Sequence, residues 1–162
     1  MGNAHSSNWH LAQANIAQMR GTLDSPIMAG LASRIEEMNT LAESNDGFVW
    51  RQPGVDVTAE ALLKFGQHHS PFEVGRVFYN MSVWESVEAL RSYVYKTSHA
   101  EMLRAKNEWV EDSDEPSLVL WWISAGTIPT IAESARRWQT LRTNGPTEAA
   151  FTMSRAFPAP TT

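Results

Sequence analysis

One short run, residues 118–123 (LVLWWI), is apolar at every position. A strand with one face in water alternates apolar and polar residues, so an unbroken apolar run indicates a strand that is covered on both faces. Helices can cover only one face of a sheet that contains this strand. We therefore expect the second face to pack against the sheet of a second copy, which makes a homodimeric barrel. The alternative is that the C-terminal segment of the same chain covers that face.

The other periodic segments predict an α+β chain. Strands are expected at residues 9–19, 47–51, 77–84 and 117–124, with a short edge strand at 151–154. Helices are expected from Ser25-Pro26 to a stop at Asn45-Asp46-Gly47, from Ser86, from the capping box Ser98-x-x-Glu101, and from the capping box Thr130-x-x-Glu133. The order β-α-β-β-α-β with extra helices is the ferredoxin-like arrangement.

The length of 162 residues predicts one domain. We assign it to residues 9–155, between a disordered N-terminal tail at 1–8 and a C-terminal tail at 156–162. The connection at 53–75 is long for a compact domain, and such loops are often covers or binding loops. No apolar run approaches the ~20 residues of a membrane span, and the N-terminus has no signal-peptide pattern. A cytoplasmic protein without a membrane partner is expected.

Charge and metal-ligand patterns exclude several functions. The net charge is −5, with acidic residues gathered at 111–115, which argues against a nucleic-acid partner. The chain has no cysteine, and no histidine pair stands at helical ligand spacing. No metal and no cofactor is therefore predicted, although His99 as an axial haem ligand is an open alternative.

Two residues are candidate catalytic groups. His99 follows the Ser98 cap, and the positive end of a helix dipole disfavours imidazolium. A neutral imidazole can act as a general base or as a hydrogen-bond donor, but a structural histidine at a helix junction is equally compatible with the pattern. Arg51 ends an apolar strand, where its planar guanidinium could hold an anion. A surface or interface salt bridge is the other interpretation of Arg51.

Polar and aromatic residues make a candidate substrate-binding set. Asn80 alternates with apolar neighbours on its strand, and it faces either a pocket or a partner subunit. Tyr95 lies on the following helix and would orient a ligand together with Asn80. Aromatic residues are unusually frequent and would line an apolar pocket, although core packing explains them equally well. The tryptophans chosen are Trp50, Trp84, Trp109 and Trp122.

Five segments resemble one family, the proteins grouped as domain of unknown function 3291. They are residues 10–17 (HLAQANIA), 47–51 (GFVWR), 81–90 (MSVWESVEAL), 118–122 (LVLWW) and 145–151 (GPTEAAF). The family looks like a branch of the dimeric α/β-barrel superfamily. That superfamily includes monooxygenases of antibiotic biosynthesis that need neither metal nor flavin, polyketide cyclases and haem enzymes. The resemblance carries over no established catalytic residue.

The residues and the resemblance together imply an enzyme of secondary metabolism. We expect an apolar, polyketide- or terpenoid-like substrate, converted by acid–base chemistry of a cyclase or isomerase, or by cofactor-independent monooxygenase chemistry. A haem-binding barrel is one alternative. A non-catalytic ligand-binding or stress-response barrel is the other.

Overall fold

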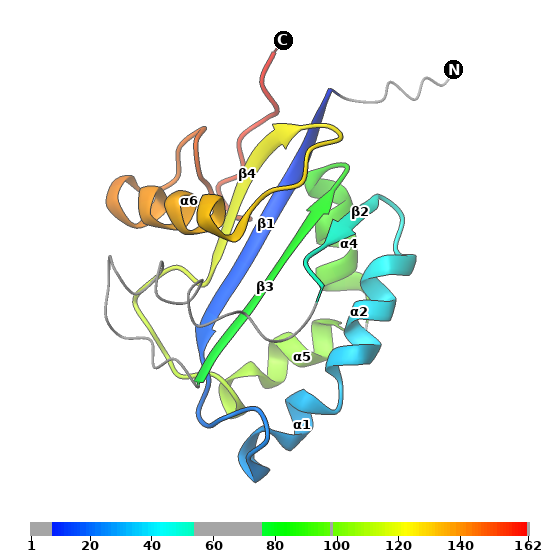
Figure 1. Ribbon diagram of the computed structural model, residues 1–162, viewed down its shortest axis with the longest axis vertical. Coiled ribbons are helices and arrows are strands. Elements are labelled where there is room, and N and C mark those ends of the chain that lie inside the picture. Colours follow the sequence, from blue (N-terminus) through cyan, green and yellow to red (C-terminus); the bar gives the residue numbers. More distant parts are fainter. Residues whose placement is uncertain (1–7, 54–75, 98, 162) are drawn as a thin grey trace.

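Four antiparallel strands form the single sheet on which the fold is built (Figure 1). The computed structural model describes residues 8–53, 76–97 and 99–161, with the side chain of His99 outside that description. The strands are β1 (Trp9–Gln18), β2 (Phe48–Arg51), β3 (Val77–Trp84) and β4 (Leu118–Ser124), in the spatial order β2-β3-β1-β4. Strand β1 pairs antiparallel with both β3 and β4. This order, with helices after β1 and after β3, confirms the predicted ferredoxin-like fold.

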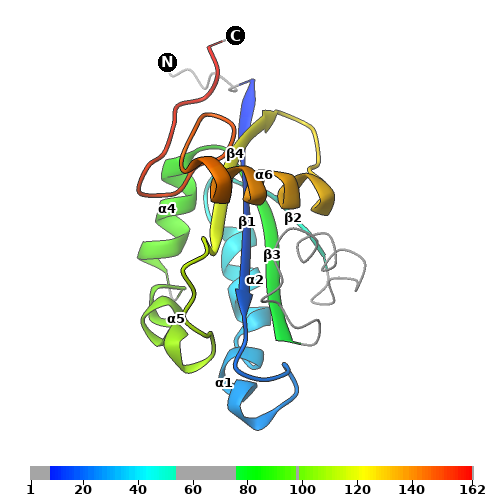
Figure 2. The same ribbon diagram turned by 90° about the vertical axis from the view of Figure 1, so that its left-hand side faces the viewer.

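Helices lie on both faces of the sheet, so the expectation that helices cover only one face was wrong (Figures 1 and 2). Helices α2, α4 and α5 lie on one face, and α6 crosses the other. The elements are η1 (Pro26–Met28), α1 (Ala29–Ala32), α2 (Ile35–Ser44), α4 (Val87–Lys96), α5 (His99–Ala105), η3 (Lys106–Glu108) and α6 (Ile131–Asn144). We call the first face the helix-facing side of the sheet, because three helices pack there, and the second the α6 side.

The covered strand β4 is buried within one chain. On the α6 side, Trp121 is fully buried and packs with Trp138 and Leu141 of α6. On the helix-facing side, Leu120 is fully buried beside Phe151. Cover of the second face by the C-terminal segment, the alternative drawn from the sequence, therefore explains why β4 is apolar throughout. The homodimer remains a prediction.

The C-terminal residues add to the packing on the helix-facing side. Phe151 forms one isolated bridge with Leu120, so the expected edge strand at 151–154 is reduced to a single pairing. Beyond residue 155, Phe157 packs against Phe151 with a ring-centroid distance of 5.8 Å. Its carbonyl oxygen accepts a hydrogen bond from Trp122 Nε1 at 2.9 Å. Residues 1–7 of the expected N-terminal tail and residues 54–75 of the long connection lie outside the described residues.

The first helical segment breaks where the sequence predicted one continuous helix. A Cβ atom at Gly30 would lie 3.1 Å from Trp109 Cζ2, so the glycine allows the indole to approach the backbone closely. The Ser33 hydroxyl donates to the Gly30 carbonyl at 3.0 Å, a local bond of the kind that competes with regular helix. The helical path is interrupted at Arg34 before α2 begins, so the prediction of one continuous helix was wrong. Its predicted stop at Asn45 is confirmed, because Asn45 is the C-cap of α2.

The predicted helix caps are mostly present. Ser86 Oγ accepts a hydrogen bond from the Ala89 amide at 3.1 Å, and Thr130 Oγ1 accepts one from the Glu133 amide at 3.0 Å. Ser25 precedes Pro26 as expected, but its hydroxyl donates to the Thr22 carbonyl and does not cap the helix. The capping box at Ser98 lies outside the described residues.

A bulge in β2 decides which of its side chains faces the helices. Phe48 pairs with Trp84, while Arg51 pairs with Ser82, and the register shifts between Phe48 and Trp50. Residues an odd number apart normally point to opposite faces, and the extra residue of a bulge reverses that relation. Arg51 therefore shares the helix-facing side with Phe48, whereas Trp50 packs on the α6 side.

Candidate functional site

A cavity of about 510 Å³ lies between the helix-facing side of the sheet and helices α2, α4 and α5. Pockets of about 300–1,000 Å³ with mainly apolar linings are typical sites for small molecules. Apolar side chains of the three helices form one part of the lining: Ile35, Met38, Leu90, Val94, Met102 and Leu103. Strands β1 and β3 form the opposite part, so the cavity belongs to one chain.

Three polar side chains on the central strands form the part of the lining that we call the polar floor: Gln13, Asn80 and Ser82. Gln13 is only 6% exposed, and its Nε2 donates to Asn80 Oδ1 at 3.0 Å and to Ser82 Oγ at 2.6 Å. Ser82 Oγ also accepts from Trp84 Nε1 at 2.8 Å. Gln13 and Ser82 are direct cross-strand partners, so the sheet register itself holds the polar floor in place.

An aromatic group lies beside the polar floor. Trp84 is fully buried, stacks on Tyr93 of α4 at a centroid distance of 5.2 Å, and meets the ring of Phe48 edge-on at 5.5 Å. The Tyr93 hydroxyl donates to the Met38 carbonyl of α2 at 3.1 Å. Burial raises the pKa of Tyr93 to about 12, so its phenol is neutral over the ordinary pH range.

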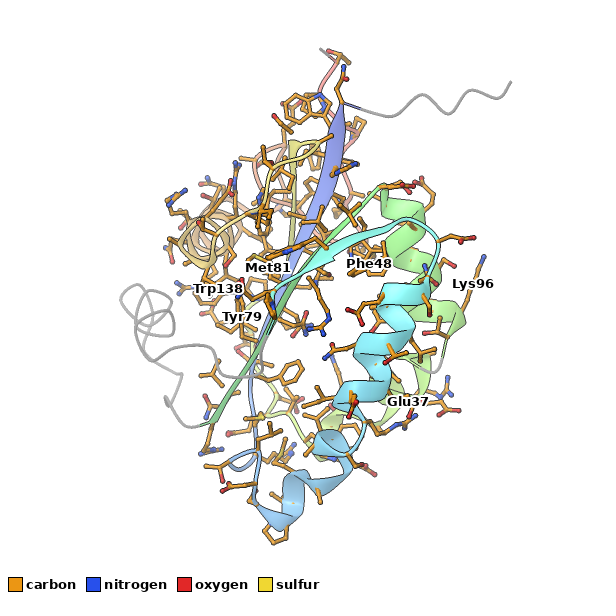
Figure 3. All side chains as sticks on the ribbon, turned by 45° about the vertical axis from the view of Figure 1, so that its right-hand side comes forward. Glu37, Phe48, Tyr79, Met81, Lys96 and Trp138 are labelled. Carbon is orange, nitrogen blue, oxygen red and sulfur yellow. The ribbon has the colours of Figure 1, made fainter. Side chains whose placement is uncertain are left out.

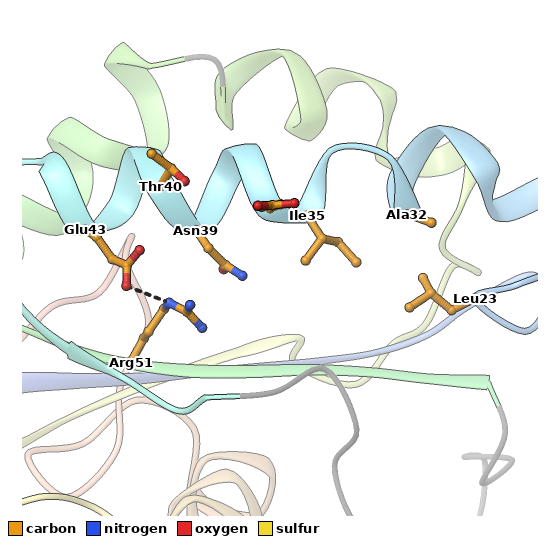
Figure 4. Close-up of a pocket in the computed structure, with 8 residues that line it drawn as sticks. Leu23, Ala32, Ile35, Asn39, Thr40, Glu43 and Arg51 are labelled. Carbon is orange, nitrogen blue, oxygen red and sulfur yellow. Dashed lines mark hydrogen bonds and ion pairs between the residues drawn. The ribbon is translucent and has the colours of Figure 1, made fainter.

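Arg51 lies where this cavity meets a second, shallower hollow of about 430 Å³ along α2. Its Nε lies 3.3 Å from Glu43 Oε2 of α2 (Figure 4). The close-up shows Asn39 and Ile35 on the same side of α2 as Glu43. Because Ile35, Asn39 and Arg51 line both spaces, the Arg51–Glu43 ion pair stands at the boundary between them.

The structure brings together most of the predicted site residues. Arg51, Asn80, Trp84, Tyr95 and Trp109 all line the cavity. Of these, Trp84 and Trp109 are buried, and Tyr95 is 58% exposed. Asn80, for which pocket and partner subunit were both open, lies in the cavity lining.

Three predicted residues are not placed in that group. Trp50 packs on the α6 side of the sheet, in the cluster that contains Tyr79, Met81 and Trp138 (Figure 3). Trp122 packs beside Phe151 and Phe157 at the C-terminal segment. The position of His99 begins α5, one turn before Met102 and Leu103, but its side chain lies outside the described residues.

Sequence reasoning missed Gln13, Ser82 and Tyr93 as members of the site. The available signal was two polar residues, Gln13 and Asn15, on one face of an otherwise apolar strand. A polar side chain in the central strand of a sheet is costly to bury unless it is hydrogen-bonded. Its expected partners are on the neighbouring strand, which the sequence pattern of β1 does not identify.

Neither a metal-ligand group nor a membrane-spanning helix is found in the described part of the chain. Within residues 8–53, 76–97 and 99–161, no group of three His, Cys, Asp or Glu side chains is placed to hold a metal ion. None of the helices in the same ranges is both long and apolar enough to cross a membrane.

The fold and the cavity define a ferredoxin-like α+β protein with a cavity of about 510 Å³ inside one chain. The chain belongs to the family described as Domain of unknown function (DUF3291), whose model matches residues 10–162. A comparison with curated proteins finds no match.

Two solved structures are similar in fold. One is NE2512, a protein of unknown function from Nitrosomonas europaea, with 10% identity, a TM-score of 0.46, and coverage of 76% of this chain and 97% of that chain. The other is SnoaB, a cofactor-independent oxygenase from Streptomyces nogalater. It has 12% identity and a TM-score of 0.43, and the match covers 74% of this chain and 95% of that chain.

Proposed function

We propose that the protein is an enzyme that converts a largely apolar, polyketide- or terpenoid-like small molecule in the central cavity. The chemistry is that of an acid–base cyclase or isomerase, or of a cofactor-independent monooxygenase. One observation carries the proposal: the cavity of about 510 Å³ combines apolar helix side chains with a hydrogen-bonded polar floor. Such a site desolvates an apolar skeleton and orients it through a few polar contacts.

The proposed roles follow from where each group lies. The polar floor orients the substrate through Asn80, while Trp84 and Trp109 contact its rings. Arg51 supplies positive charge at the edge of the cavity and stabilises a phenolate or enolate. His99 is proposed as the proton acceptor, and Tyr95 contacts the exposed end of the substrate.

An oxygenase of this kind needs no group beyond substrate and oxygen. Removal of a proton from a phenolic ketone gives an enolate, which transfers an electron to O₂. For an anthrone, the methylene carbon loses both hydrogens and gains one oxygen atom to become a carbonyl, and the second oxygen atom leaves as water. The protein contributes a base, a fixed positive charge and a dry cavity, all of which favour the enolate.

A non-catalytic binding protein is a second candidate, and one observation favours it. Three of the five charged side chains that line the cavity are held in ion pairs: Arg51 with Glu43, Glu111 with Arg76, and Glu115 with Arg142. A charge already neutralised by a partner is less available to a reacting group.

An oxygen-uptake assay with a hydroxylated anthrone separates these functions. We expect the purified protein to accelerate oxygen consumption and anthraquinone formation, with His99→Ala and Arg51→Ala each reducing kcat at least about tenfold. Arg136→Ala is the matched control, because Arg136 is exposed on α6, across the sheet from the cavity. Binding without oxygen uptake or isomerisation would favour the non-catalytic candidate, and a Soret absorption band in the purified protein would favour haem.

A further inference from the structure

Gln13 is held in one orientation by its neighbours on β3. Both hydrogens of its side-chain amide are used, one by Asn80 Oδ1 at 3.0 Å and one by Ser82 Oγ at 2.6 Å. Ser82 Oγ also accepts a hydrogen bond from the indole N–H of Trp84. The amide nitrogen of Gln13 therefore faces β3, and its Oε1 is turned away from that strand.

The Oε1 atom of Gln13 is an available acceptor. None of the described residues donates a hydrogen bond to it, although Gln13 is only 6% exposed and lines the cavity. Oε1 is not among the buried unpaired side-chain atoms, so it opens into the cavity, where a ligand group that carries an O–H or N–H can donate to it.

The same arrangement leaves a donor beside that acceptor. Ser82 Oγ accepts two hydrogen bonds, from Gln13 and from Trp84, and so uses both of its lone pairs. Its own hydroxyl hydrogen has no acceptor among the described residues, and Ser82 lines the cavity. An acceptor on Gln13 and a donor on Ser82 thus stand side by side in the polar floor.

We propose that Gln13 is a specificity-determining residue that selects a neutral ligand with a hydroxyl or N–H group on an apolar ring system. This inference rests on the proposed function, because it assumes that the cavity binds a small molecule. The ligand group donates to Gln13 Oε1 and accepts from Ser82 Oγ–H. A phenol or an enol satisfies both contacts with one oxygen atom, whereas an ether satisfies only the second.

The test compares β-naphthol with its methyl ether by isothermal titration calorimetry on the full-length protein. The wild type is expected to bind β-naphthol about tenfold more tightly, the effect of one additional hydrogen bond in the cavity. In Gln13→Leu, a change of similar size, this ratio is expected to fall to about one. Asn80 is exposed and Ser82 keeps its bond from Trp84, so the variant is expected to fold.

Gln139→Leu is the matched control, because the same substitution is made on α6, across the sheet from the cavity. It should keep the wild-type ratio. A Gln13→Leu variant that also keeps the wild-type ratio would overturn the role of Gln13. Equal binding of both probes to the wild type would do the same, and would leave the cavity as a binding site. If neither probe binds the wild type, the inference and the proposed function both fail.

Discussion

Replacing Trp84 with phenylalanine tests the packing on which the cavity depends. The substitution keeps a six-membered ring in the cluster but removes the indole N–H that donates to Ser82 Oγ at 2.8 Å. It also weakens the stacking on Tyr93 and the edge contact with Phe48. Loss of the hydrogen bond costs about 1 kcal/mol, and the lost aromatic contacts cost about 1–2 kcal/mol.

The expected total for Trp84→Phe is a loss of about 2–3 kcal/mol in the free energy of unfolding. For a chain of this size, that corresponds to a fall in Tm of about 5–10 °C. Urea denaturation followed by far-UV circular dichroism measures the change. Trp50→Phe is the control, since Trp50 is only partly buried, and it should cost less than about 1 kcal/mol. A Trp84→Phe variant as stable as the wild type would refute the assigned contacts.

Three other perturbations have defined outcomes. Ser82→Ala removes the acceptor of the buried Trp84 N–H, and urea titration should show a loss of about 1–3 kcal/mol; a loss below about 0.5 kcal/mol would contradict that bond. Gly47→Ala should cost more than Gly145→Ala in the same assay. Both glycines have positive φ, which costs about 1–2 kcal/mol, but only at Gly47 would a Cβ meet another side chain, 2.4 Å from Ala89 Cβ. Burial raises the pKa of Tyr79 and Tyr93 from 10.0 to about 12, so the fold favours the neutral phenols. The stability that comes from the neutral phenols is intact below about pH 10 and is lost as the pH rises towards about 12. The urea concentration at the unfolding midpoint should therefore decrease when the pH is raised from about 9 to about 11. The decrease should be smaller in a Tyr79→Phe/Tyr93→Phe variant.

The sequence predicted the architecture because its signals are local or periodic. Ser86 and Thr130 cap their helices through hydroxyl groups three residues before the amides that they accept from, a spacing visible in the sequence. The apolar run at 118–123 required cover on both sides, and β4 has it. What covers the second face depends on tertiary packing, so the pattern left the C-terminal segment and a second copy as alternatives.

The details of the site depend on contacts between distant residues. The bulge in β2 turns Arg51 to the helix-facing side and Trp50 to the α6 side. The sequence of β2 contains no glycine or other turn residue from which the bulge could be predicted. Gly30 of α1, just before the break, lies close to the indole of Trp109, a contact between residues far apart in sequence. The role of Gln13 in the site depends on its hydrogen bonds to Asn80 and Ser82. The pairing register of β1 and β3 brings these residues together, and the sequence of β1 alone does not show it.

A crystal structure of the protein with β-naphthol bound tests the central claim most directly, namely that the cavity between the sheet and helices α2, α4 and α5 is the ligand site. We predict one ligand per chain in this cavity, with its ring beside Trp84 and its hydroxyl oxygen within hydrogen-bond distance of Gln13 Oε1 and Ser82 Oγ. A ligand bound only outside this cavity, with the cavity filled by side chains, would contradict the account.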